Sequence, residues 1–257
     1  MASRARAALM SFSVTVLGSS AWYATPDRAA SGYLVDFGGA RLWLDAGGGT
    51  WVRLLETLDF ADVDGVLLSH RHPDHTIDVF QLFHARQYGG PEPMEPIPLW
   101  APAETIDRVL AFTSQVDEAF DLRCVEPNDK IDIAGASFSF FDMAHPPETL
   151  GVRIERDGGV FAYSADTGPD FDVEGLAGDA DVFLCEATYQ DGDRLWEGHL
   201  SATQAATAAV SGGASSLVLT HLPPGHDLGI SLAEASKAAG GVRVQLAADG
   251  LQMEVGG

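Results

Sequence analysis

The residues with the clearest chemical potential form one short stretch, Ser69-His70-Arg71-His72-Pro73-Asp74-His75. Neutral imidazole nitrogens and carboxylate oxygens are ligands for zinc and similar divalent ions. On an extended segment His70 and His72 project to the same side, and the proline turn that follows can direct Asp74 and His75 towards a second point. The spacing therefore predicts a metal site and suits two neighbouring ions better than one. The alternative is a surface cluster of histidines.

Three further candidate ligands follow predicted strands later in the chain. His145 comes shortly after residues 136–142, Asp166 comes after residues 159–164, and His221 directly follows residues 216–220. Strand ends collected on one edge of a sheet are where α/β proteins build sites. Each of these residues alone would be unremarkable, but their shared position predicts that they join the cluster formed by residues 70–75.

These side chains must be positioned by alternating strands and helices. Short apolar runs bounded by glycine or proline predict strands, and runs that are apolar on one helical face predict helices. Strands are expected over 12–17, 32–37, 41–44, 63–69, 99–101, 131–133, 136–142, 151–154, 159–164, 181–185, 216–220 and 242–246. Helices are expected after a capping Thr50 and over 76–88, 104–112, 202–210 and 232–239. We expect one α/β domain over residues 1–257.

Three local patterns refine this expectation. Ser201 with Gln204 forms a capping box at the start of the helix over 202–210. Three glycines at 47–49 follow Asp45, and because no Lys-Ser/Thr pair comes after them they predict a tight turn rather than a phosphate-binding loop. Asp45 would then be buried in support of the metal loop. The proline-rich segment 89–98 is expected to form a stiff loop that walls the site.

The bulk composition indicates a soluble globular protein. The chain has 257 residues, is 46% hydrophobic and contains two cysteines. No apolar stretch approaches the roughly 20 residues that cross a bilayer, and two cysteines do not make a disulfide framework. We therefore expect a cytoplasmic protein without membrane association. Residues 1–10 lack an apolar signal core and are expected to be a disordered extension, with Met10 as an alternative start.

The charge restricts the class of partner. The formal net charge is −22, and only 15 lysines and arginines are present. Such a surface repels polyanions, so tight binding of a long nucleic acid is disfavoured. A small anion bound directly at two dications remains compatible, because the ions invert the local field. The acidity itself fits either solubility or adaptation to a salty cytoplasm.

The pattern His-x-His-x-Asp-His with later His, Asp and His resembles that of the metallo-β-lactamase-fold hydrolases over nearly the whole chain, from 12 to 255. The resemblance implies an αββα four-layer sandwich of two mixed sheets with helices outside. It implies two divalent ions, with zinc as the default and manganese or iron as alternatives. The implied ligands are His70, His72 and His145 for one ion and Asp74, His75 and His221 for the other, with Asp166 bridging both.

Two later motifs resemble the ribonuclease Z branch of that superfamily, Glu186-Ala187-Thr188 and His199-Leu200-Ser201. In that branch a glutamate holds a histidine that contacts the phosphate and can protonate the leaving group. The resemblance implies that Glu186 orients His199, and that the helix starting after Ser201 directs its positive end at the anion. The alternative is a surface histidine with an unrelated charge at a helix end.

One feature of that branch is missing. Ribonuclease Z carries an arm that grips transfer RNA, inserted between the third histidine ligand and the bridging aspartate. Here only 20 residues separate His145 from Asp166, enough for one hairpin. The chain is more similar to the small bacterial members described as atypical class II cyclic nucleotide phosphodiesterases. The shared stretches are 164–168, 181–187, 199–201 and 219–224.

The leading hypothesis is a binuclear phosphodiesterase that hydrolyses a small nucleotide, cyclic nucleotides included. A hydroxide held between two metals is a nucleophile at neutral pH, and Asp74 would orient it or accept its proton. The alternatives are a transfer RNA 3′-end endonuclease, a lactone or ester hydrolase on the same metals, and a non-catalytic binding module. The substrate would be a small anionic phosphodiester, and the resemblance also suggests a homodimer.

Overall fold

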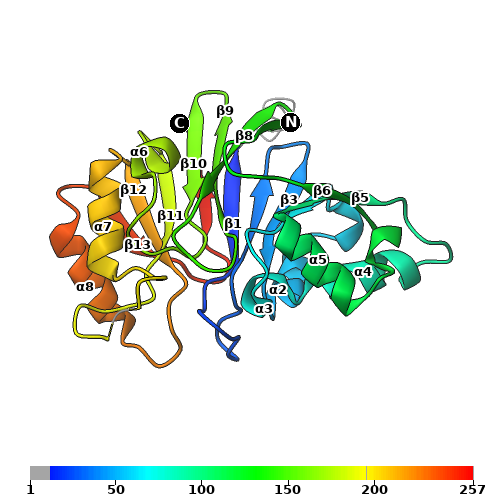
Figure 1. Ribbon diagram of the computed structural model, residues 1–257, viewed down its shortest axis with the longest axis horizontal. Coiled ribbons are helices and arrows are strands. Elements are labelled where there is room, and N and C mark those ends of the chain that lie inside the picture. Colours follow the sequence, from blue (N-terminus) through cyan, green and yellow to red (C-terminus); the bar gives the residue numbers. More distant parts are fainter. Residues whose placement is uncertain (1–11, 195, 257) are drawn as a thin grey trace, which may run out of the picture.

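Two seven-stranded β-sheets face each other, and helices cover both outer faces in a computed structural model of the chain (Figure 1). The structure describes residues 12–194 and 196–256, so the expected extension over 1–10 lies outside the described residues. The observed layers confirm the αββα sandwich. None of the helices in the described part of the chain combines the length and apolar character that crossing a membrane requires.

The first sheet is antiparallel in one half and parallel in the other. Its strands in spatial order are β14 (Gln252–Glu254), β1 (Ser13–Gly18), β2 (Gly32–Asp36), β3 (Arg41–Ala46), β4 (Gly65–Leu67), β5 (Ile97–Ala101) and β6 (Phe120–Cys124). Pairing is antiparallel from β14 to β3 and parallel from β3 to β6. The helices of this half are α2 (Thr50–Thr57), α3 (Pro73–Thr76), α4 (Val79–Tyr88) and α5 (Ala103–Phe112), with 3-10 turns at Phe60–Asp62 and Val116–Glu118.

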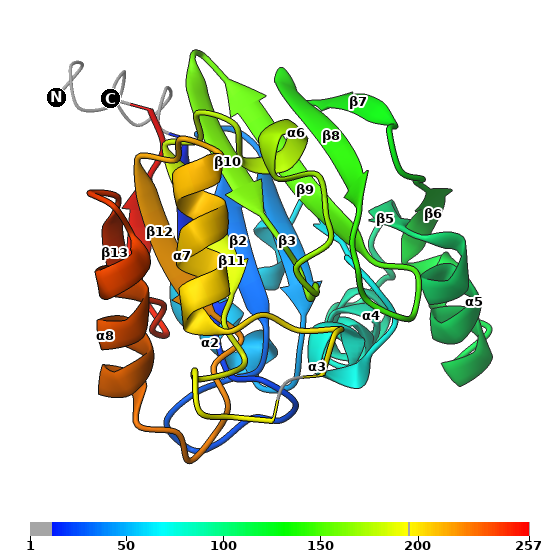
Figure 2. The same cartoon turned by 60° about the vertical axis from the view of Figure 1, so that its left-hand side comes forward.

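The second sheet has the same mixed character. Its strands in spatial order are β13 (Arg243–Leu246), β12 (Ser216–Thr220), β11 (Val182–Glu186), β10 (Gly159–Tyr163), β9 (Leu150–Arg156), β8 (Ala136–Asp142) and β7 (Lys130–Ile133). Pairing is parallel from β13 to β10 and antiparallel from β10 to β7. The helices of this half are α6 (Val173–Ala177), α7 (Ala202–Ser211) and α8 (Leu228–Ala238), and Figure 2 shows α7 and α8 side by side.

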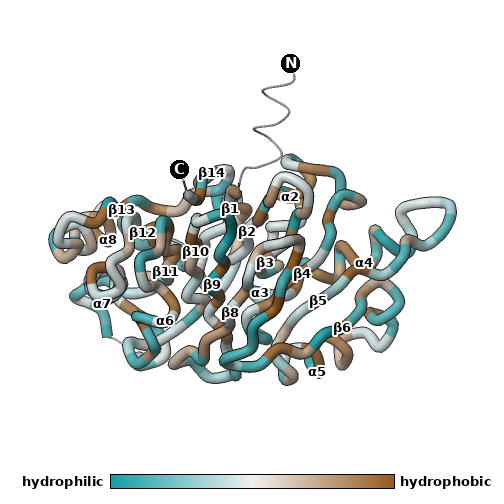
Figure 3. Tube along the Cα trace, turned by 90° about the horizontal axis from the view of Figure 1, so that it is seen from above, coloured by the Kyte–Doolittle hydropathy of each residue, from teal (hydrophilic) through white to brown (hydrophobic). Residues whose placement is uncertain are grey.

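Three apolar layers hold the sandwich together. The central layer lies between the sheets, where Tyr33 meets Tyr163 with ring centroids 5.0 Å apart and Phe37 meets Phe138 at 5.9 Å. A second layer lies under α6, α7 and α8 and is rich in alanine, and a third lies under the helices of the first half. Figure 3 shows α6, α7 and α8 at one end and α4 and α5 at the other, with most of the strands between them. Burial of these apolar faces is the main favourable term that fixes the two sheets face to face.

Side-chain caps begin α6, α7 and α8, whereas α2 begins without one. The predicted capping box at α7 is confirmed, because the Ser201 hydroxyl accepts from the Gln204 N–H and the Gln204 side chain accepts from the Ser201 N–H. The predicted cap at Thr50 is wrong. Gly49 occupies the N-cap of α2 with φ 91°, and the Thr50 hydroxyl donates to the Gly47 carbonyl at 2.6 Å. Glycine tolerates that left-handed backbone, which threonine does not.

The helix predicted over 76–88 is confirmed over α4 only, because Thr76 is the last residue of the separate helix α3. Between them the Asp78 N–H donates to the Ala46 carbonyl at 2.8 Å, and the Asp78 carboxylate accepts from the Trp51 N–H at 2.9 Å. These tertiary hydrogen bonds replace the helical ones at the junction. As a result the four-residue α3, which carries Asp74 and His75, is oriented independently of α4.

The proline-rich loop does not border the candidate site. It runs into β5 at Ile97, the amino end of that strand, and β5 is parallel to β4. The residues 70–75 follow the carboxyl end of β4, so the loop lies at the opposite end of the sheet. The prediction that this loop walls the site is therefore wrong.

Candidate metal centre

The predicted site residues come together at one end of the sandwich, where the two sheets meet. His70 follows β4 of the first sheet, whereas His145, Asp166 and His221 follow β8, β10 and β12 of the second. The expectation of a single sheet edge is corrected, because both sheets contribute. All four residues follow the carboxyl ends of strands, as in other α/β sites, although β8 pairs antiparallel with both of its neighbours.

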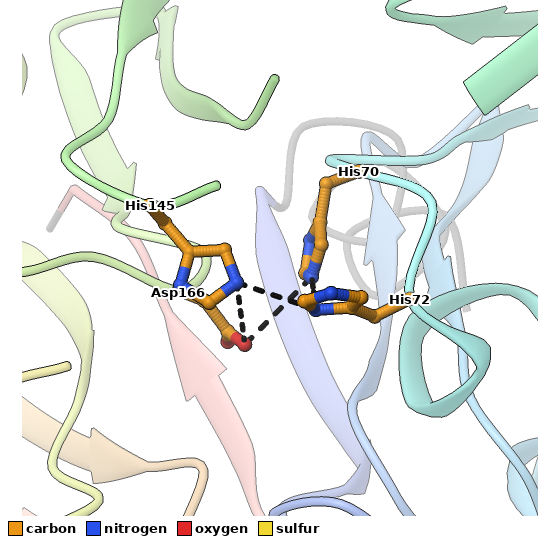
Figure 4. A group of neighbouring side chains, drawn as sticks. All are labelled: His70, His72, His145 and Asp166. Atoms are coloured by element: carbon orange, nitrogen blue, oxygen red, sulfur yellow. Dashed lines mark hydrogen bonds and ion pairs between the residues drawn. The ribbon is translucent and has the colours of Figure 1, made fainter. Parts of the chain in front are cut away.

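The first group consists of His70, His72, His145 and Asp166, which point towards one another (Figure 4). The Nδ1 atom of His72 lies 3.0 Å from Nε2 of His70 and 3.2 Å from Nε2 of His145. Asp166 Oδ2 lies 3.7 Å from His70 Nε2 and 3.9 Å from His145 Nε2. Because β4 ends at Leu67, His70 and His72 lie on a loop, and the loop rather than strand alternation makes them converge.

The second group consists of Asp74, His75 and His221. Asp74 Oδ2 lies 3.4 Å from Nε2 of His221 and 3.9 Å from Nε2 of His75. Asp166 lies between the groups, with Oδ1 3.2 Å from His75 Nε2 and Oδ2 3.5 Å from His221 Nε2. The structure thus brings all seven residues together, in a first group of four that includes Asp166 and a second group of three, and Asp166 also lies close to His75 and His221.

The donor set fits divalent cations. His75 Nε2 and Asp166 Oδ1 are buried and 3.2 Å apart, and neither has a hydrogen-bond partner among the described residues, although buried polar groups are normally satisfied. Burial lowers the pKa of His70, His72 and His145, so these imidazoles are neutral, as ligation requires. Burial opposes a positive charge on His75, but the Asp166 and Asp45 carboxylates raise its pKa well above the ordinary value. The His/Asp cluster therefore suggests divalent metal ions.

Asp45 orients the second group. Its carboxylate is fully buried and accepts hydrogen bonds from the Ser69 N–H at 2.7 Å, the Ser69 hydroxyl at 2.8 Å and the Tyr163 hydroxyl at 2.7 Å. It also accepts from Nδ1 of His75 at 2.8 Å, which leaves Nε2 of His75 facing the site. Carboxylates that hold metal-ligating histidines in this way fix the tautomer and the ring direction. The predicted burial of Asp45 is confirmed.

Two other imidazoles are fixed from outside the cluster. Nδ1 of His145 donates to the Gly198 carbonyl at 2.8 Å. The Thr188 hydroxyl lies 2.8 Å from Nδ1 of His221 and donates to Glu186 at 2.7 Å, so it accepts from His221. Both contacts leave Nε2 directed at the cluster.

The three-glycine turn allows α3, which carries Asp74, to approach closely. A Cβ at Gly47 would lie 2.0 Å from the Asp74 carbonyl oxygen, which only glycine avoids. The same carbonyl accepts from the Ser31 N–H at 3.2 Å, and the Trp22 N–H donates to Asp74 Oδ2 at 2.9 Å. The predicted tight turn is confirmed.

His199 and Glu186 form a pair beside the cluster. Nδ1 of His199 donates to Glu186 Oε1 at 2.8 Å, and its ring stacks on His221 with centroids 5.3 Å apart. Glu186 is fully buried, and it also accepts from the Thr167 N–H and the Leu200 N–H. Burial alone would lower the pKa of His199, but the Glu186 carboxylate raises it to about 9. His199 is therefore a cation at neutral pH, with Nε2 unused by Glu186.

The sequence did not anticipate that His199 also lies within ligand distance of Asp166 and His221. Nor did it identify the supporting contacts of Tyr163, Thr188 and Gly198. Tyr163 looks like any core residue of a strand, and a backbone carbonyl such as that of Gly198 leaves no signal in the sequence. Thr188 stands in a motif that the sequence singled out, but its bridging contact required the fold.

Residues 12–222 match the family model of the β-lactamase superfamily domain. The chain belongs to this family. An uncharacterized protein of Mycobacterium leprae is 38% identical over 82% of this chain and 78% of its own length. A ribonuclease Z of Kineococcus radiotolerans is 27% identical over 92% of this chain and 93% of its own. The crystal structure of the metallo-β-lactamase fold protein YhfI from Bacillus subtilis superposes with a TM-score of 0.87 at 25% identity, covering 95% of this chain and 98% of that one.

These matches confirm the metallo-β-lactamase fold and the presence of ribonuclease Z among the relatives. Family membership together with the His/Asp cluster identifies the protein as a metallo-hydrolase of the β-lactamase superfamily.

Proposed function

We propose that the protein is a binuclear metal-dependent phosphodiesterase that hydrolyses a small nucleotide phosphodiester, with cyclic nucleotides as the first candidates. The pair of His199 and Glu186 beside the His/Asp cluster is the observation that carries the proposal. Hydrolysis of a phosphodiester requires a proton donor for the leaving oxygen, in addition to groups that stabilise the phosphoryl oxygens. A cationic histidine buried next to the cluster meets that requirement. Relatives named ribonuclease Z support it.

In the proposed hydrolysis, the metal site, Asp74 and His199 each have a separate role. When bound, two dications would lower the pKa of a water molecule and polarise the phosphoryl oxygen. Asp74 belongs to the second group, with its Oδ2 next to His221 and His75, and can orient the attacking water or accept its proton. His199 contacts the phosphate and donates its Nε2 proton to the leaving oxygen, while Glu186 keeps the ring charged and oriented.

The short connection between His145 and Asp166 supports a small substrate. The β9–β10 hairpin takes up most of the 20 residues between His145 and Asp166, which leaves no length for an arm that grips an RNA. The net charge of −22 also opposes a long polyanion. Cleavage of transfer RNA at its 3′ end remains the second candidate because ribonuclease Z proteins align over almost the whole chain. Lactone or ester hydrolysis would use the same ions without a need for His199.

Three further features belong to the same proposal. Zinc is the expected ion at both positions because the donors are mainly imidazoles, with manganese or iron as alternatives. A cytoplasmic location fits the free cysteines, exposed Cys124 and buried Cys185. The homodimer implied by the resemblance also stays a proposal.

A substrate panel tests the function directly. The metal-loaded protein is offered a 3′,5′-cyclic nucleotide, a chromogenic phosphodiester, a precursor transfer RNA and a lactone, with bound metal measured in parallel. We expect hydrolysis of the first two substrates. Specific cleavage of the precursor RNA at low protein concentration would favour the endonuclease, and activity on the lactone alone would favour an ester hydrolase. A protein that binds no metal in metal-replete buffer would indicate a non-catalytic module.

The pH dependence should follow His199. A proton donor acts in its protonated form, so kcat is expected to stay high below the His199 pKa of about 9 and to fall as pH rises through it. Glu186→Gln removes the carboxylate that raises this pKa, so the alkaline fall should move to lower pH. The measurement is kcat against pH for both proteins. An alkaline limb at the same pH in both would contradict control of His199 by Glu186.

A further inference from the structure

An exposed tryptophan borders the candidate site. Trp196 is 48% exposed, although tryptophan is usually well buried. Its ring centroid lies 5.6 Å from that of His145 and 5.4 Å from that of His199, in edge-to-face arrangements of 75° and 66°. The indole thus contacts both a predicted ligand and the predicted proton donor, and almost half of its surface remains open to solvent.

The backbone around Trp196 holds the indole in this place. The Trp196 carbonyl accepts from the His199 N–H at 3.2 Å and closes a tight turn. A Cβ at Gly198 would lie 2.4 Å from the indole atom Cζ3. The indole therefore packs directly against the Gly198 backbone and leaves no room for a side chain at this position. The Gly198 carbonyl in turn accepts from His145. One turn therefore joins the exposed indole to the two histidines of the site.

A nucleotide matches this combination of groups. Its anionic phosphate suits the His/Asp cluster and His199, and its base is a planar ring joined to the phosphate through one sugar. Aromatic side chains stack on bases with little regard to base identity, because every base has a π-face. An exposed indole next to an anion site therefore distinguishes a phosphodiester that carries a planar ring from one that does not.

We propose that Trp196 is a specificity-determining residue whose open indole face stacks on the base of a nucleotide bound at the His/Asp cluster. The proposal deepens the proposed function and rests on it, since it concerns the same site. It predicts selectivity for nucleotides over base-free sugar phosphates, with little discrimination between bases.

Equilibrium binding tests this role without relying on turnover. Calorimetry compares adenosine 5′-monophosphate with ribose 5-phosphate on the metal-loaded full chain. Wild type should bind the nucleotide more tightly. Trp196→Ala should weaken nucleotide binding by about 10-fold, in the range found for base–aromatic stacking, with less than a twofold change for ribose 5-phosphate. Trp196→Phe should recover most of the affinity because it keeps an aromatic ring.

Tyr88→Ala is the matched control, since Tyr88 is 66% exposed at the end of α4. It should leave both affinities unchanged. If Trp196→Ala weakens the binding of both ligands equally, the residue only supports the fold and the proposal is overturned. The same conclusion holds if Trp196→Phe weakens nucleotide binding as much as Trp196→Ala does. Unchanged nucleotide binding in Trp196→Ala would also overturn the proposal.

Turnover separates this proposal from the proposed function. If wild type hydrolyses no phosphodiester, the proposed function fails, while a Trp196-dependent preference for the nucleotide would still support stacking. If wild type hydrolyses a cyclic nucleotide and a base-free cyclic phosphodiester with the same KM, the phosphodiesterase stands and the role of Trp196 is wrong. The expected result is a higher KM of Trp196→Ala for the cyclic nucleotide alone.

Discussion

Replacing His199 with alanine is expected to lower kcat for a small phosphodiester by about 10²- to 10⁴-fold, the usual contribution of a positioned acid or base. The bound metal should stay the same as in wild type, because the predicted ligands and their supports do not include His199. The physical reason is the loss of a cationic proton donor that Glu186 holds beside the cluster. Steady-state kinetics and elemental analysis of the same samples measure the two effects.

His84→Ala is the control for this prediction, since His84 is an exposed histidine on α4. It should change neither kcat nor metal content. Unchanged turnover in His199→Ala would refute the role of proton donor. Loss of metal in step with activity would instead make His199 a ligand, which its proximity to Asp166 and His221 permits.

Asp166→Ala is expected to have the second large effect, the loss of tight metal binding and of activity together. Asp166 lies between the two groups, with its oxygens 3.2 Å from His75 Nε2 and 3.5 Å from His221 Nε2. A ligand that binds only the folded state stabilises it in proportion to the logarithm of its concentration over Kd. Zinc should therefore raise the Tm of wild type but not, or much less, that of the variant.

Asp107→Ala provides the comparison, because Asp107 is an exposed aspartate on α5. Its Tm should respond to zinc as wild type does. A full zinc-dependent rise in Tm for Asp166→Ala, with two ions still bound, would show that the aspartate is not a shared ligand.

The candidate ligands could be predicted because their chemistry is concentrated in the sequence. Three histidines and one aspartate in six positions have no ordinary structural explanation, and His145, Asp166 and His221 each follow a recognisable strand. The parallel and antiparallel pairing was not predictable in the same way. Two edge strands were not predicted: β6 does alternate apolar with charged residues, but over only five residues, and β14 has only three residues.

The supports of the site depend on contacts between distant segments. Asp45 could be predicted as a buried support, since it stands between a strand and a glycine turn, but its contact with Tyr163 spans 118 residues. Thr188 bridges Glu186 and His221 only because β11 and β12 pair in parallel and end together. Such contacts are set by sheet register, which local patterns do not determine.

The most direct test of the account is a zinc titration of the metal-free protein, in which bound zinc and hydrolysis of a 3′,5′-cyclic nucleotide are followed in the same samples. We expect two ions per chain and hydrolysis that reaches its maximum as the second position fills. A protein that holds two zinc ions and hydrolyses no phosphodiester, or one that reaches full activity with a single ion, would contradict this expectation.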